Sequence, residues 1–82
     1  MIISIKKSDV GYNNMSYSYK DDFVRIDFTF GLLEIVINNK VIYSHVLKIK
    51  GLKEQELKEL INPIIIETLI KNGVYVERVI IK

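Results

Sequence analysis

Apolar and polar residues alternate along much of the first half of the chain, which is the pattern of β-strands with one buried face. Residues 2–6 are β-prone, and residues 15–20 alternate larger apolar or aromatic residues with serine. Between them, residues 8–14 are rich in turn-forming types and are expected to form a loop. The polar residues 20–22 would then close a hairpin.

Residues 23–38 are predicted to form one long strand that bends at Gly31. Before Gly31 the even positions are apolar, and after it the odd positions are apolar. A β-bulge explains this change, since one extra residue shifts the side-chain alternation by one and bends the strand. The alternative is a tight hairpin at Gly31, because single glycines also occur in turns.

A stronger turn signal follows at residues 38–40, where two asparagines tolerate the left-handed backbone region. A three-residue loop there predicts a further strand over residues 41–50. Alternate residues of that strand would face the core, and these are Val41, Tyr43, His45, Leu47 and Ile49.

An amphipathic helix follows this strand, and its apolar stripe changes side at Asn62-Pro63. Two short helices would resolve the change, with Asn62 as the N-cap of the second and Gly73 after its last turn. Otherwise the helix is continuous and kinked by the proline, and it leaves Ile66 and Ile70 on its outer face.

The chain closes with a predicted strand over residues 74–82 that is apolar on both faces. The order of elements is an antiparallel β-meander with a long bent strand, a proline-broken helix or two short helices packed on the sheet, and a C-terminal strand. This order predicts an α+β fold, with residues 1–82 as a single domain.

Composition narrows the classes of function. The chain has 82 residues, is 49% hydrophobic, contains no cysteine and carries a formal net charge of +2. The absence of cysteine excludes disulfides and thiolate chemistry. No apolar stretch approaches the roughly 20 residues of a membrane span, and the first residues lack the pattern of a secretory signal. We therefore expect a cytoplasmic protein without membrane contact.

Candidate catalytic and metal-binding residues are few. His45 is the only histidine, and the adjacent Ser44 would point to the opposite face of a strand, which is wrong for a nucleophile–base pair. A metal site needs three or four convergent ligands, and the carboxylates here are scattered. The four glycines stand singly rather than in a phosphate-binding loop. We expect no enzyme activity, no metal site and no cofactor.

Tyrosines and lysines in the first quarter of the chain raise nucleic-acid binding as an alternative function. Aromatic and basic residues on one sheet face can stack bases and contact phosphates, although acidic residues lie in the same region. The residues of this alternative are Tyr12, Tyr17, Tyr19, Lys6, Lys7 and Lys20.

The favoured prediction is a small, non-catalytic protein-interaction domain that forms a homo-oligomer. The apolar last strand and the two helical stripes imply more apolar surface than one sheet–helix layer covers, and exposed edge strands invite strand addition. The candidate partner-binding residues are Ile66, Ile70, Tyr75, Val79 and Ile81. The small size and a composition typical of AT-rich genomes further suggest a phage or mobile-element protein that binds and inhibits a host or defence factor.

Overall fold

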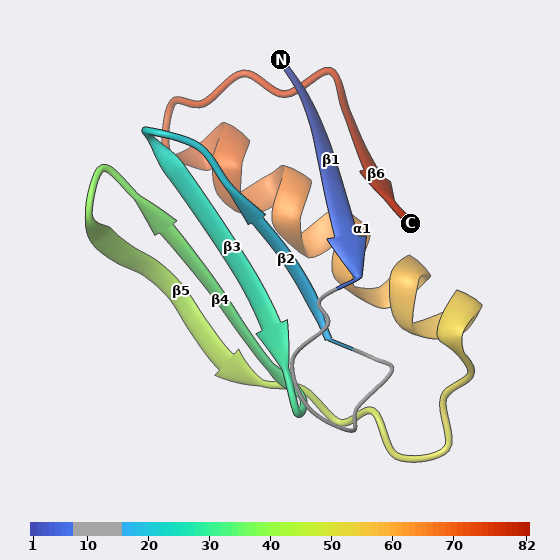
Figure 1. Ribbon diagram of the computed structural model, residues 1–82. Coiled ribbons are helices and arrows are strands. Elements are labelled where there is room, and N and C mark those ends of the chain that lie inside the picture. Colours follow the sequence, from blue (N-terminus) through green and yellow to red (C-terminus); the bar gives the residue numbers. More distant parts are fainter. Residues whose placement is uncertain (8–15) are drawn as a thin grey trace.

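The computed structural model describes residues 1–7 and 16–82, which form a six-stranded sheet with a helix packed against one face (Figure 1). The predicted loop over residues 8–14 lies outside this described part. In chain order, the elements are β1 (Ile2–Lys7), β2 (Tyr17–Lys20), β3 (Val24–Thr29), β4 (Leu32–Ile37), β5 (Lys40–Val46), α1 (Glu54–Lys71) and β6 (Arg78–Ile81). The prediction of an α+β fold is confirmed.

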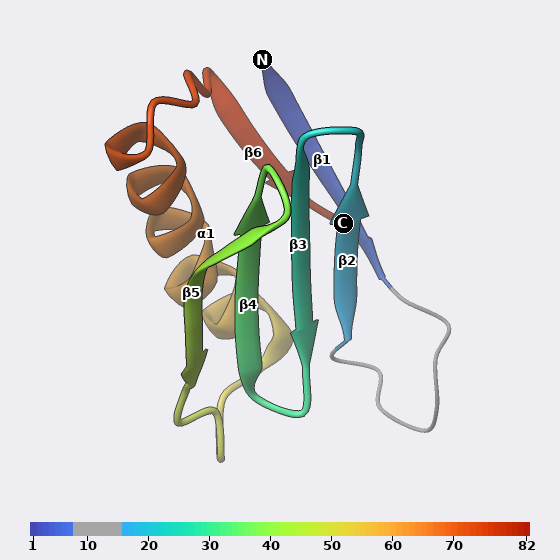
Figure 2. The same cartoon turned by 90° about the vertical axis from the view of Figure 1, so that its left-hand side faces the viewer.

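The strands lie in the order β5-β4-β3-β2-β1-β6. The pairs from β1 to β5 are antiparallel, whereas β1 and β6 are parallel. The chain therefore leaves the sheet at β5, crosses one face through α1 and returns at the opposite edge, so that the first and last strands lie side by side (Figures 1 and 2).

β3 and β4 form a tight hairpin, and the prediction of one long bent strand was wrong. Thr29 pairs with Leu32, so Phe30 and Gly31 are the two turn residues, with φ angles of 51° and 87°. A two-residue turn pairs even positions with odd positions. It therefore produces the same change of apolar phase as a bulge, and the hairpin alternative is the one observed.

A second two-residue turn, Asn38-Asn39, joins β4 to β5, with φ angles of 51° and 63°. The predicted three-residue loop was wrong, because Ile37 pairs directly with Lys40. The register then shifts within the β4–β5 pair, and Ile42 is the extra residue of a β-bulge in β5. A bulge exists in this sheet, but one strand later than predicted.

The bulge and the position of β5 decide which of its residues reach the core. Of the predicted inward row, Tyr43, Leu47 and Ile49 are partly buried against the core, whereas Val41 and His45 are exposed. β5 lies at the sheet edge, and α1 packs on β4 and β6 instead. A residue on the inward side of β5 is therefore only partly covered.

α1 runs as one helix through Pro63, so the division into two short helices was wrong. Its buried residues recur every four positions and form a single stripe, which removes the predicted change of side: Leu57, Ile61, Ile65 and Leu69. Pro63 is exposed, so the Glu59 carbonyl that it leaves without an intrahelical partner lies on the solvent side of α1.

Asn62 lies inside the helix rather than at a cap. Its side-chain amide donates a hydrogen bond to the Val79 carbonyl at 2.9 Å and so connects α1 to β6. Gly73 ends the helix as predicted, with a φ of 82°, and the following Val74 N–H bonds the Leu69 carbonyl at 2.9 Å.

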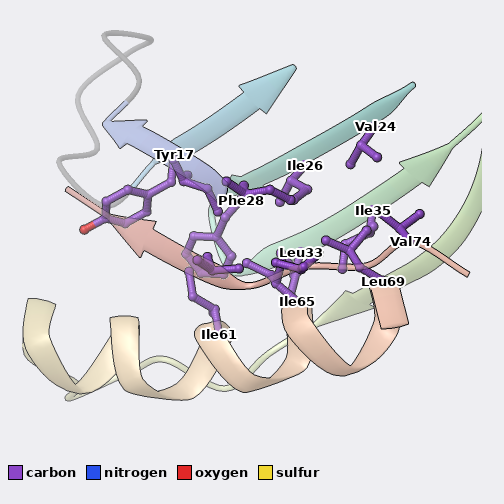
Figure 3. Close-up of a cluster of buried hydrophobic side chains, with 14 of the residues drawn as sticks. Tyr17, Val24, Ile26, Phe28, Leu33, Ile35, Ile61, Ile65, Leu69 and Val74 are labelled. Carbon is purple, nitrogen blue, oxygen red and sulfur yellow. The ribbon is translucent and has the colours of Figure 1, made fainter. Parts of the chain in front are cut away.

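The core fills the space between α1 and the covered face of the sheet (Figure 3). Strand residues from β1 to β4 meet the helical stripe there, and ten of the fully buried positions are Ile3, Ile5, Val24, Ile26, Phe28, Leu33, Ile35, Leu57, Ile61 and Ile65. Val74 and Val76 are also buried, but in the connection between α1 and β6. The last strand is therefore shorter than the predicted residues 74–82.

Candidate protein-interaction surface

β5 presents a free edge within the described part of the chain, because it pairs with β4 alone. The Leu47 N–H bonds the Gly31 carbonyl at 2.8 Å. In an antiparallel ladder the backbone groups of alternate residues point to opposite sides of the strand, so those of Ser44 and Val46 point away from β4. The edge thus offers donors and acceptors to an additional strand.

Three exposed apolar side chains lie beside this edge, at one end of the sheet. Leu32 and Val46 are paired across β4 and β5, and Phe30 stands two residues before Leu32 in the turn. The exposed fractions are 72% for Phe30, 38% for Leu32 and 77% for Val46. Leu33, the next residue after Leu32, is buried beneath the helix. Leu32 and its partner Val46 therefore lie on the face opposite α1. We call Phe30, Leu32 and Val46 the apolar end cluster.

Phe30 adopts a backbone conformation that its residue type disfavours. Turns with positive φ at both central positions favour glycine, asparagine and aspartate, and the Asn38-Asn39 turn follows this rule. A bulky residue in the left-handed region costs about 1–2 kcal/mol relative to its preferred regions. Neither turn geometry nor burial accounts for an aromatic side chain at Phe30, and such departures concentrate at functional sites.

The helix side of β5 borders a groove of about 360 Å³ between β5 and the C-terminal half of α1. Its apolar lining comes from both elements and consists of Ile42, Tyr43 and Ile64. Along the helical rim, Glu67 and Lys71 form an ion pair at 2.9 Å. β5 is therefore flanked by apolar surface on both sides of the sheet.

The chain around β5 is basic. Residues 40–53 contain no carboxylate and four lysines, all exposed: Lys40, Lys48, Lys50 and Lys53. None of the four takes part in an ion pair among residues 1–7 and 16–82. By contrast, Arg25 on the helix-free face is paired with both Asp27 and Glu34. Unpaired positive charge thus flanks β5, with Lys40 at its start and the other three lysines after its end.

The opposite edge of the sheet is better protected. β6 has only four residues and begins with the charged Arg78. The Asn62 side chain bonds the Val79 carbonyl, and the adjoining groove against α1 is lined largely by polar residues. Short edge strands and charged residues are common protections against strand addition. β5 is longer, with seven residues, and residues 41–47 contain no lysine, arginine or carboxylate.

The predicted partner-binding residues do not form one accessible surface, because some are exposed and others are buried. Ile70 and Tyr75 are exposed, at 52% and 72%, whereas Ile66 and Ile81 are partly buried against the core. Val79 is only 6% exposed and belongs to the core. Its parallel pairing with β1 turns its side chain toward α1, so it does not lie on an accessible surface.

Two tyrosines of the nucleic-acid alternative, Tyr17 and Tyr19, face the core. Tyr17 is 1% exposed, and its hydroxyl donates to Glu54 at 3.1 Å. Burial and the bond to Glu54 raise the pKa of Tyr17 to about 12. Tyr19 is partly buried and donates to Asp21, and burial with this bond raises its pKa to about 12. Neither ring forms an open platform for base stacking.

Of the lysines of the same alternative, Lys7 lies beside Tyr17 in the β1–β2 register, and both side chains contact Glu54. Lys6 and Lys20 are exposed on the face opposite α1, whereas Lys7 pairs with Glu54 at 2.8 Å on the helix side. Tyr12 lies outside the residues that the structure describes.

No group of three or more histidine or carboxylate side chains is placed to hold a metal ion in the described ranges. His45 is exposed and its ring lies 4.6 Å from that of Tyr43, centroid to centroid. Ser44 projects from the other face of β5, as the sequence predicts for neighbouring strand residues. The geometry does not assemble a nucleophile and a base from these two residues.

The apolar end cluster was not predicted from the sequence. A signal was present, because Phe30 occupies a position next to glycine where a hairpin turn favours asparagine. Leu32 and Val46 are also apolar residues out of phase with the buried rows of their strands. Only the hairpin register shows that the two are paired.

No helix among the described residues has the length and apolar character that a membrane crossing requires. No protein-family model, no curated protein and no solved structure matches this chain.

Proposed function

We propose that this chain is a protein-binding domain whose contact surface is the apolar end cluster together with the free edge of β5. The observation that carries the proposal is Phe30, a 72% exposed aromatic side chain on a left-handed turn residue beside two further exposed apolar residues. Folding gains little from these side chains, whereas aromatic residues are enriched among those that dominate protein interfaces.

The free edge supports the same proposal by an independent route. An extended segment that pairs with β5 would obtain backbone hydrogen bonds from Ser44 and Val46, and its side chains on the helix-free face would lie beside Val46. Backbone pairing supplies affinity, and contacts with flanking side chains supply specificity. Both kinds of contact are available in the same small region.

Inhibition of a host or defence factor is the narrower form of this proposal. Blocking a partner by occupying its surface requires no catalytic group, which fits a chain of this size. Composition and size are the support for such a target and for a cytoplasmic location. A homo-oligomer remains a prediction and is tested by light scattering, where the monomer mass is 9.6 kDa.

Capture from an extract of the source cells tests the proposal with two matched pairs of variants. The first pair, Leu32→Asp with Val46→Asp, places charge in the apolar end cluster. The second pair, Ile70→Asp with Tyr75→Asp, places the same charge on exposed apolar residues elsewhere. Circular dichroism and the thermal midpoint confirm that both proteins remain folded.

We expect wild type and the Ile70/Tyr75 pair to retain the same partner, identified by mass spectrometry. The Leu32/Val46 pair should lose at least about tenfold of that retention, because two buried charges would be left in the interface. The opposite pattern, with loss only in the Ile70/Tyr75 pair, would overturn the proposal and move the interface to the end of α1.

A further inference from the structure

We infer that the segment bound at β5 is an extended, acidic strand with apolar side chains on both of its faces. This inference rests on the proposed function and names the chemical class of the partner. Backbone, side-chain and charge observations each contribute one part of it.

The backbone of β5 limits the length of the added strand. The free groups of Ser44 and Val46 can pair with alternate residues of a neighbour. Toward the start of β5, the bulge at Ile42 interrupts the regular ladder. A partner strand therefore has about five residues in register with Tyr43 to Leu47.

The side chains of the partner strand would meet apolar surface on both faces. Those on the helix-free face would lie beside Val46 and extend the apolar end cluster. Those on the helix face would lie beside Tyr43 and His45, at the groove lined by Ile42 and Ile64. Because successive strand residues point to opposite faces, apolar residues are favoured at adjacent positions of the partner.

The positive charge around β5 favours a negatively charged partner strand. Lys48 and Lys50 follow β5 directly, Lys40 begins it, and residues 40–53 contain no carboxylate. An antiparallel second copy of β5 would bring Lys40 of one chain near Lys50 of the other, and like charges on adjacent strands are unfavourable. Carboxylates at the ends of a foreign strand would instead be attracted to these lysines.

Peptide titration of the ¹⁵N-labelled full chain tests this inference by NMR. The probe is acetyl-Glu-Val-Thr-Val-Tyr-Val-Glu-amide, and the two control peptides replace both glutamates by glutamine or by lysine. We expect the Ser44 and Val46 amide signals to shift most. The acidic peptide should bind about fivefold more tightly than the glutamine peptide, and added salt should reduce the difference.

Two charge variants and one backbone variant isolate the contacts. Lys48→Glu with Lys50→Glu should abolish the preference for the acidic peptide, whereas Lys6→Glu with Lys82→Glu changes the net charge equally and should preserve it. Val46→Pro removes an N–H that points to the free edge rather than into the β4 ladder, so the fold should persist while peptide binding is lost.

Equal binding of all three peptides would overturn the acidic preference and leave strand addition standing. If no peptide shifts Ser44 or Val46 while capture still depends on Leu32 and Val46, strand addition is overturned, and the proposed function survives with the apolar end cluster alone as its contact surface. A mass above 9.6 kDa that Val46→Pro abolishes would assign the edge to a second copy, against this inference. Salt-sensitive oligonucleotide binding lost in the Lys48/Lys50 variant, without peptide binding, would also overturn it.

Discussion

Phe30 shows how a single residue can be placed against its own conformational preference. The two-residue turns β3–β4 and β4–β5 both have positive φ at their two central positions, yet one is Phe30-Gly31 and the other is Asn38-Asn39. Gly31 meets the demand of its position, since it has a φ of 87° and an added Cβ would lie 3.3 Å from the Leu47 carbonyl oxygen. Phe30 does not meet it, and its side chain is left in solvent.

Replacement of Phe30 by asparagine should therefore stabilise the fold and weaken partner binding. Asn-Gly is the preferred pair for this turn, so Phe30→Asn should raise the free energy of unfolding by about 1 kcal/mol. Urea denaturation measures the gain, and capture of the partner measures the loss. A variant that is less stable than wild type would show that the phenyl ring contributes to folding, and would remove the main argument for its role in binding.

Tyr17 and Glu54 connect β2 to the start of α1, and their contact makes the free energy of unfolding fall at high pH. The pKa of Tyr17 is raised to about 12 by burial and by the bond to Glu54. A raised folded pKa favours the protonated form, so the contribution of this hydroxyl is complete below its ordinary pKa of about 10. It is then lost as the pH rises toward 12.

We expect the wild-type free energy of unfolding to fall more steeply between about pH 10 and 12 than that of Tyr17→Phe, which has no hydroxyl to ionise. Urea titrations at several pH values measure both slopes. Tyr75→Phe is the matched control, because Tyr75 is 72% exposed and should leave the wild-type slope unchanged. Equal slopes for wild type and Tyr17→Phe would contradict the coupling.

At the scale of the elements, periodicity predicted the strands and the helix but could not decide how they connect. The change of apolar phase at Gly31 is produced equally by a bulge and by a two-residue turn, so the pattern alone leaves both open. The register of β5 was missed for a related reason, since the bulge at Ile42 has no glycine to mark it. The last strand begins only at Arg78, because Val74 and Val76 belong to the loop after α1 and are buried from there. An alternating apolar pattern fits such a loop as well as a strand.

The proline in α1 shows that tertiary packing can override a local helix-breaking signal. Pro63 removes one intrahelical hydrogen bond, yet the stripe from Leu57 to Leu69 packs as one continuous face on the sheet. The exposed position of Pro63 keeps its ring and the freed Glu59 carbonyl away from the core. The sequence signal was real, but the apolar contacts on the opposite side of the helix outweighed it.

Pro63→Ala should therefore raise the free energy of unfolding by about 1–3 kcal/mol, because alanine restores the bond to Glu59 and relieves the clash of the ring with the preceding turn. Chemical denaturation measures the change. Ile70→Ala on the same helix replaces a 52% exposed side chain and should change stability by no more than about 0.5 kcal/mol. A loss of stability in Pro63→Ala would mean that the proline ring itself packs favourably.

At the scale of the whole molecule, the first and last strands pair with each other, and the β5 edge of the sheet is left without a partner strand in the described part of the chain. The parallel pair β1–β6 places the first strand beside the last, and α1 spans the sheet between its two edges. No local pattern predicts this pairing, because it links residues at opposite ends of the sequence. The apolar end cluster could not be found from the sequence either, because it depends on the β4–β5 register and on which face of the sheet α1 covers.

Hydrogen exchange should reveal the asymmetry of the sheet directly. The amides of His45 and Leu47 face β4, and Leu47 bonds Gly31 at 2.8 Å, whereas those of Ser44 and Val46 face the free edge. In the unbound protein we expect the amides of Ser44 and Val46 to exchange at least about tenfold faster than those of His45 and Leu47. The amides of His45 and Leu47 exchange only after their hydrogen bonds toward β4 break. NMR after transfer to heavy water measures all four rates in one experiment. Protection of Ser44 and Val46 that grows with protein concentration would contradict a free edge and indicate that another copy covers it. Protection that instead appears only when the acidic peptide is added would place the bound strand along these two residues.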